Sequence, residues 1–70
     1  MTFGEKIKEI RTAQGLSLQA LAKKCNLSVV SVWNCEIGRT KPSPLTIAKL
    51  ANGLNYSYEE LYALAQQERN

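Results

Sequence analysis

Histidine is absent from this 70-residue sequence, and cysteine occurs only twice. Histidine is the commonest metal ligand and the side chain most often used for acid–base catalysis near neutral pH. Cys25 and Cys35 lack the C-x-x-C spacing of zinc and redox sites and occupy apolar positions of predicted helices. We interpret them as buried core thiols. The sequence therefore predicts a protein that is not an enzyme and has no metal site and no cofactor.

Long apolar runs are also missing. No stretch approaches the roughly 20 consecutive apolar residues of a membrane span, and charges follow soon after Met1, at Glu5, Lys6 and Lys8. We therefore expect a cytoplasmic protein with no membrane partner. The hydrophobic fraction of 44% and charged fraction of 21% are typical of a folded globular protein. A chain of this length has room for a single domain, which we expect to span residues 1–70.

Apolar residues recur at helical spacing in five segments, and no segment alternates like a strand. A hydroxyl residue precedes each segment, where it can accept a hydrogen bond from an unpaired N–H group of the first helical turn. These residues are Thr2, Ser17, Ser28, Ser43 and Ser57. A glutamate follows Thr2 and Ser57 three residues later, as in a capping box. Gly15, Asn26 and Asn55 are the predicted helix ends, because these residue types tolerate the left-handed backbone found there.

The stretch from Ser17 to Gly38 has the pattern of a helix-turn-helix. Leu21, Ala22 and Cys25 repeat at helical spacing, and Asn26 interrupts the repeat. After Ser28 the repeat resumes with Val32, Cys35 and Glu36. Two short helices joined by a tight polar turn are therefore predicted.

The chain resembles the phage-repressor and Cro-type (XRE) helix-turn-helix family from about Phe3 to Tyr62. The matching positions are Arg11, Gly15, Leu16, Ser17, Leu21, Ala22, Ser28, Val32, Glu36, Gly38, Pro42, Ala51 and Leu54. The resemblance implies an all-α, compact five-helix lambda-repressor-like domain with the helix-turn-helix at helices 2 and 3. It also implies a sequence-specific transcriptional regulator, such as a phage-type repressor or small controller protein, with residues 29–37 in the major groove of double-stranded DNA. In proteins of this family, the arginine of the first helix usually pairs with the glutamate at the end of the recognition helix. The resemblance therefore implies a pair between Arg11 and Glu36.

The predicted DNA-binding residues lie on the two central helices and the loop that follows them. They are Ser17, Leu18, Gln19, Ser28, Val29, Val30, Ser31, Trp33, Asn34, Arg39, Thr40 and Lys41. Asn34 is the best candidate for direct base readout, because its amide can bond adenine bidentately, and the valines could contact thymine methyl groups. Basic residues support this reading, since the net charge is +3 and Arg39 and Lys41 follow the recognition helix.

The sequence differs from the family where DNA contacts are expected. Leu18 stands where a glutamine is common, and Val29 and Val30 stand where polar residues are common. Val29 could simply pack on Leu18. An alternative reading is a protein-interaction module that keeps the fold and uses Val29, Val30, Trp33 and Ile37 as an apolar docking face.

The last helix is predicted to carry a contact between two copies of the chain. With Leu61 and Leu64 assigned to the core, Tyr58, Tyr62 and Ala65 remain as apolar surface. Family members usually bind two-fold related half-sites, so we expect a homodimer on DNA. Separately solvated tyrosines are the alternative explanation for this surface.

Overall fold

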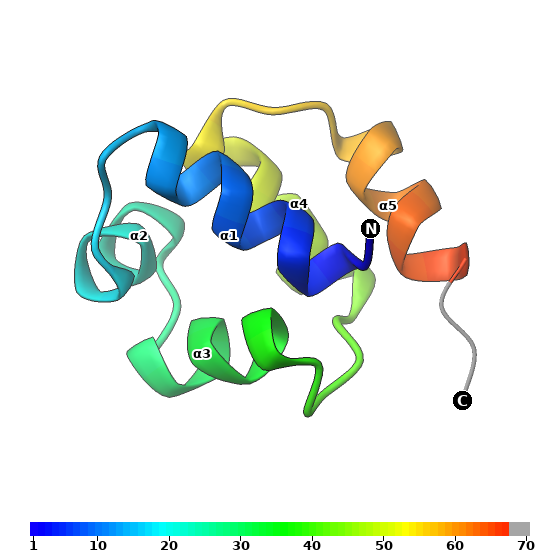
Figure 1. Ribbon diagram of the computed structural model, residues 1–70, viewed down its shortest axis with the longest axis horizontal. Coiled ribbons are helices and arrows are strands. Elements are labelled where there is room, and N and C mark those ends of the chain that lie inside the picture. The colour runs from blue at the N-terminus through cyan, green and yellow to red at the C-terminus, as the bar shows by residue number, and fades with distance from the viewer. Residues whose placement is uncertain (68–70) are drawn as a thin grey trace.

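Five helices follow one another along the chain in the computed structural model, which describes residues 1–67 (Figure 1). They are α1 (Phe3–Ala13), α2 (Leu18–Cys25), α3 (Val29–Ile37), α4 (Pro44–Leu54) and α5 (Tyr58–Gln67). No strand occurs within the described residues. The predicted all-α fold class, with a helix-turn-helix formed by the second and third helices, is confirmed.

Side-chain hydroxyls cap the helix starts as predicted. The Thr2 hydroxyl accepts from the Glu5 N–H at 3.1 Å, and the Glu5 carboxylate accepts from the Thr2 N–H at 2.9 Å, which completes a capping box. Ser17, Ser28 and Ser43 cap α2, α3 and α4 by accepting from the N–H group three residues later, without the reciprocal glutamate bond. At α5 the structure shows one half of the second box: the Glu60 N–H donates to Ser57 at 3.2 Å. The Glu60 carboxylate accepts from the Tyr56 hydroxyl at 3.0 Å.

Left-handed residues end the helices. Gly15, Asn26 and Asn55 have φ values of 71°, 56° and 55°, and Gly38 has a φ of 77°. Asparagine tolerates this conformation better than most residues that carry a Cβ atom. The chain can therefore reverse direction within a few residues, which keeps the turns between helices short.

The core lies where all five helices meet. Its buried apolar side chains are Phe3, Ile7, Ile10, Leu21, Ala22, Cys25, Val32, Cys35, Ile47, Leu50, Ala51, Leu54, Leu61 and Ala65. The α1 helix packs on α3 and α5, and α4 packs on α2 and α5. The α2 and α3 helices also pack on each other. The helix-turn-helix thus rests on a support formed by α1 and α4.

Two glycines allow helices to approach unusually closely. A Cβ atom on Gly4 of α1 would collide with the carbonyl oxygens of Cys35 and Glu36 at the end of α3. A Cβ atom on Gly53 of α4 would collide with the thiol of Cys25 in α2. Glycine inside a helix normally costs about 1 kcal/mol relative to alanine. Here it brings each helix of the helix-turn-helix against its supporting helix.

The orientation of α5 corrects one prediction. Ala65 is 2% exposed and packs in the core with Leu61, whereas Leu64 is only partly buried. The expectation that Ala65 belongs to an apolar surface for dimerisation is therefore wrong. Residues three and four positions from Leu61 lie on the same side of a helix, so spacing alone cannot tell which of them faces the core. Tyr58 is partly buried against the core, and Tyr62 is 37% exposed.

Replacing Gly4 with alanine should destabilise the domain by about 1–3 kcal/mol, the usual cost of overpacking, despite alanine's better helix propensity. The backbone oxygens that meet the new methyl group cannot rotate away. Urea unfolding would measure the change. Lys8→Ala, at an exposed position of the same helix, is the control and should leave the midpoint nearly unchanged. A Gly4→Ala variant as stable as the parent would show that α1 and α3 can separate at little cost.

Candidate nucleic-acid interface

The turn between α2 and α3 is held by backbone and side-chain contacts. Asn26 adopts φ 56° and ψ 47°, and the Leu27 N–H donates to the Ala22 carbonyl at 2.9 Å. The Leu27 side chain packs against the core. From α4, the Lys49 amino group lies 3.4 Å from the Asn26 carbonyl oxygen. The direction in which α3 leaves α2 is therefore fixed by both the turn and the neighbouring helix.

An ion pair between Arg11 and Glu36 fastens α3 to α1. The arginine Nε and Nη2 donate to the two carboxylate oxygens at 2.6 and 3.1 Å. Its Nη1 donates to the Leu16 carbonyl, just before α2, at 2.8 Å. The side chains are 11% and 3% exposed, so the bidentate hydrogen bonds compensate for their desolvation. The predicted pair is confirmed, and it also reaches the entrance to α2.

The α3 helix has a buried side and an exposed side. Val32 and Cys35 are 0% and 4% exposed and face the core. Val30, Trp33 and Ile37 are 65%, 48% and 48% exposed, as predicted for the outward face. Val29, at the edge of this face, is 37% exposed, and Asn34 is partly exposed. In Figure 1, α3 lies along the lower edge of the molecule. It can thus meet a large partner without displacing another helix.

The serines at the starts of α2 and α3 already have structural roles. The Ser17 hydroxyl accepts from the Ala20 N–H at 3.1 Å. The Ser28 hydroxyl accepts from the Ser31 N–H at 3.0 Å and donates to the Ser31 hydroxyl at 2.9 Å. Helix starts nevertheless present unpaired N–H groups to an anion. For α2 these belong to the residues that follow Ser17, namely Leu18, which is partly buried against the core, and the exposed Gln19.

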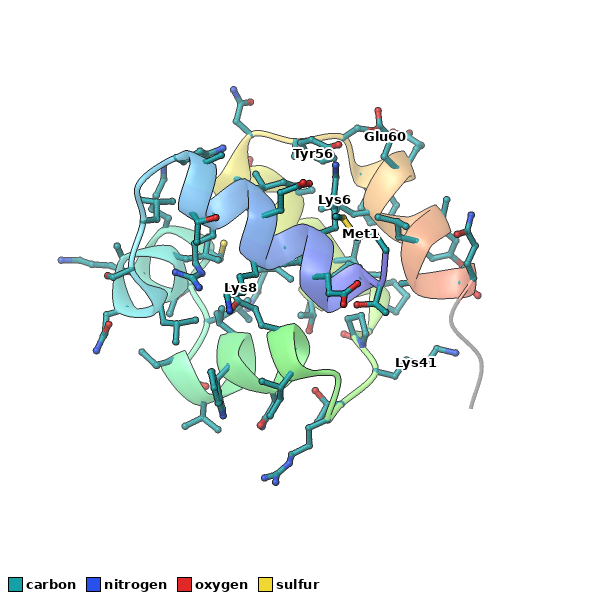
Figure 2. The ribbon with its side chains drawn as sticks, in the orientation of Figure 1. Met1, Lys6, Lys8, Lys41, Tyr56 and Glu60 are labelled. Atoms are coloured by element: carbon teal, nitrogen blue, oxygen red, sulfur yellow. The ribbon has the colours of Figure 1, made fainter. Side chains whose placement is uncertain are left out.

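Basic side chains flank α3 on the loop that follows it. Arg39, Thr40 and Lys41 are exposed, and Figure 2 shows Lys41 on this loop. The Arg39 N–H donates to the Asn34 carbonyl at 2.9 Å, which holds the start of the loop against the end of α3. The structure therefore places the predicted loop residues directly after the end of α3, with Arg39 held against its last turn.

Both cysteines are core residues as predicted, with Cys25 3% exposed and Cys35 4% exposed. Burial raises the pKa of each thiol, because it disfavours the charged thiolate. A hydrogen bond with the Thr40 side chain opposes part of the pKa shift of Cys35. Both sulfurs are therefore protonated at neutral pH and are poor nucleophiles.

One residue that supports this surface was not found from the sequence. Lys49 of α4 reaches back to the turn of the helix-turn-helix, where it contacts the Asn26 carbonyl oxygen. Asn26 and Lys49 lie far apart in the chain, so no local pattern links them.

Among residues 1–67, no three potential metal ligands gather into a group. In the same range, no helix is both long and apolar enough to cross a membrane.

Comparison with known proteins identifies the family of this chain. A family model described as helix-turn-helix matches residues 7–61. The chain belongs to this XRE-type helix-turn-helix family. It is 39% identical over 64 residues to the Bacillus subtilis uncharacterized HTH-type transcriptional regulator RghRB, a match that covers 90% of this chain and 46% of that protein. It is 36% identical over 61 residues to the HTH-type transcriptional repressor RghR of the same species, covering 86% of this chain and 45% of that one.

Two further matches are also helix-turn-helix transcriptional regulators. An SPbeta prophage-derived uncharacterized HTH-type transcriptional regulator, YonR of B. subtilis, is 36% identical over 59 residues, which are 84% of this chain and 55% of that protein. A crystal structure of an HTH_3 family transcriptional regulator from Vibrio cholerae superposes with a TM-score of 0.81 at 30% identity, covering 93% of this chain and 37% of that one. This chain thus spans about half the length of the curated relatives it matches.

Glu36→Ala should destabilise the domain by about 3–5 kcal/mol, because it leaves the Arg11 cation buried without its partner. Urea unfolding would show a midpoint lowered by several molar, or a chain already unfolded in buffer. Glu36→Gln, which retains one acceptor oxygen, should lose less.

The control is Glu9→Ala, which breaks the exposed pair of Glu9 with Lys6 and should leave the midpoint nearly unchanged. Equal midpoints for Glu36→Ala and the parent protein would contradict a stabilising role for the buried pair.

Proposed function

We propose that this chain is a sequence-specific DNA-binding regulator of transcription that inserts α3 into the major groove. The supporting observation is that α3 is fixed from behind by the Arg11–Glu36 pair while its opposite face is exposed. Membership of the helix-turn-helix family agrees with this role. One of its relatives is named a transcriptional repressor and another a prophage-derived regulator. A phage-type repressor or small controller protein acting in the cytoplasm is therefore the favoured form of this function.

The dimensions of α3 are compatible with insertion into the major groove of DNA. Its nine residues span about 13 Å at 1.5 Å per residue, and the major groove is about 12 Å wide and admits a helix. The first residues of a recognition helix contact base edges in this class of protein. Val29, Val30 and Trp33 would therefore meet the bases or sugars, together with Asn34. We infer that Val29 also touches Leu18 and forms with it a dry platform at the edge of the groove.

Phosphates are held on both sides of this helix. At the start of α2, the backbone N–H groups of Leu18 and Gln19 are directed as anion-binding donors. On the other side, Arg39, Thr40 and Lys41 approach the backbone of the DNA. Such contacts release counterions and supply affinity without selecting a sequence.

A protein-interaction role is the second candidate, and the exposed apolar side chains of Val30, Trp33 and Ile37 favour it. Contiguous apolar surface often marks a site for another protein. Binding to random duplex DNA at low salt, with steep loss of affinity as salt rises, separates the two functions. Selection of bound sequences from a random duplex pool would then give the preferred site. Absence of DNA binding at low salt would favour the protein-interaction role.

Two single substitutions should separate specificity from affinity. Asn34→Ala should weaken binding to the selected site by about 1–3 kcal/mol and relax base preference at one position, because it removes the bidentate contact. Arg39→Ala should weaken all sequences alike and lower the slope of log K against log salt by about one unit. Fluorescence anisotropy over a salt series measures both quantities. An unchanged site preference in Asn34→Ala would remove Asn34 from the base-reading set.

We also propose that two copies bind one operator through α5. Half-sites in this class lie about 34 Å apart, close to the 29 Å longest dimension of the domain, so neighbouring copies would lie near contact. In Figure 1, α5 forms one end of the molecule, where it packs on α1 and α4. Its tyrosines Tyr58 and Tyr62 stack with ring centroids 5.7 Å apart, and Tyr62 remains exposed. Tyr62 is the centre of the proposed contact, and Ala65, which is buried, is not part of it.

Sedimentation equilibrium on a selected duplex should show two chains per duplex. Tyr62→Ala should reduce the cooperativity of binding to that duplex, because it removes the exposed ring of the stacked pair. Leu45→Ala, which removes an exposed apolar side chain from α4, is the matched control and should keep the cooperativity. A strict one-to-one complex on the full selected site would contradict the dimer.

A further inference from the structure

The base-reading part of α3 has unusually little hydrogen-bonding capacity. Of its first five side chains, Val32 faces the core, and Val29, Val30 and Trp33 are exposed. The fifth, Ser31, is partly buried and accepts a hydrogen bond from the Ser28 hydroxyl. Val30 and Trp33 are 65% and 48% exposed on one face, one turn apart. The part of α3 that would enter the groove first is therefore mainly an apolar surface.

An apolar surface can distinguish bases in the major groove by only one kind of group. Base edges there present hydrogen-bond donors and acceptors, together with the C5-methyl group of thymine. A 5-methylcytosine carries a methyl group at the same ring position. Burying such a group against Val30 or the ring face of Trp33 is favourable, whereas placing an unsatisfied donor or acceptor against these apolar groups is costly. The favoured ligand is therefore a pyrimidine with a C5-methyl group.

We propose that Val30 and Trp33 read pyrimidine C5-methyl groups, and that 5-methylcytosine can replace thymine at the positions they contact. Binding of this protein would then respond to cytosine methylation of its operator. The inference rests on the proposed function and adds the chemical group that the recognition helix selects. Val29, 37% exposed, lies at the margin of this methyl-reading surface.

The surroundings of the methyl-reading surface favour DNA over a protein as its occupant. Arg39 and Lys41 lie exposed on the loop that directly follows α3. The acidic side chain of α3, Glu36, is 3% exposed and is neutralised by Arg11. An apolar strip bordered by cations is complementary to methyl groups in a groove bordered by phosphates.

The experiment is selection from three random duplex pools. The first contains ordinary bases, the second contains uracil in place of thymine, and the third contains uracil in place of thymine and 5-methylcytosine in place of cytosine. The first pool should yield a motif that includes thymines. In the second pool, each contacted position should lose about threefold to fivefold in affinity, the scale of one buried methyl group. Some positions of the first motif will prefer thymine only because of its methyl group. At these positions, the third pool should yield 5-methylcytosine.

Variants assign the effect to the methyl-reading surface. Val30→Thr keeps the shape of valine but exchanges a methyl for a hydroxyl, so it should bring the affinity ratio between thymine and uracil sites toward one. Because Val30 is 65% exposed, the variant should fold, and its circular dichroism spectrum checks this. Leu45→Ala, at a position of 66% exposure on α4, is the matched control and should leave the ratio unchanged.

The outcomes separate this inference from the function on which it rests. Equal motifs and affinities from the thymine and uracil pools would overturn methyl readout and leave DNA recognition standing. A thymine-to-uracil ratio unaffected by Val30→Thr and by Trp33→Ala would also overturn it. No enrichment from the ordinary pool would overturn both the inference and the proposed DNA-binding function.

Discussion

The buried pair of Arg11 and Glu36 is the interaction on which the placement of the helix-turn-helix depends. One guanidinium bonds the last turn of α3 and the carbonyl of Leu16 before α2, so one side chain from α1 sets both helices of the motif. A charge with so little exposure is tolerable only when its hydrogen bonds are made. The geometry of the outward face of α3 therefore follows from polar contacts on its inward side.

Close helix packing completes this support. Gly4 lets α1 lie against the carbonyls at the end of α3, and Gly53 lets α4 lie against Cys25 of α2. Each supporting helix thus meets one helix of the motif at a position where a side chain would not fit. In a domain that buries only about 60% of its unfolded surface, such contacts contribute strongly to a small total stability. Rigid support lets α3 present its exposed side chains in a fixed arrangement.

The two faces of α3 have different roles. Its buried side carries Val32, Cys35 and the carboxylate of Glu36, which hold the fold together. Its exposed side carries apolar groups and the amide of Asn34, which belong to the proposed recognition of DNA. Basic residues on the following loop, and the starts of α2 and α3, suit the less selective task of holding phosphates. At the far end of the domain, the exposed ring of Tyr62 on α5 suits the proposed contact between copies.

The sequence by itself determined the helices and the family. Hydroxyl caps, left-handed ends and apolar spacing are local signals, and they predicted the five helices, the helix-turn-helix and the outward position of Val30 and Trp33. The resemblance added the pairing of Arg11 with Glu36. The tertiary structure alone decided which side of α5 is buried, so that Ala65 belongs to the core and Leu64 to its edge. It also decided the close approaches at Gly4 and Gly53 and the reach of Lys49 to Asn26. These features join residues distant in the chain, and their physical cause is the packing of helices, which no local spacing records.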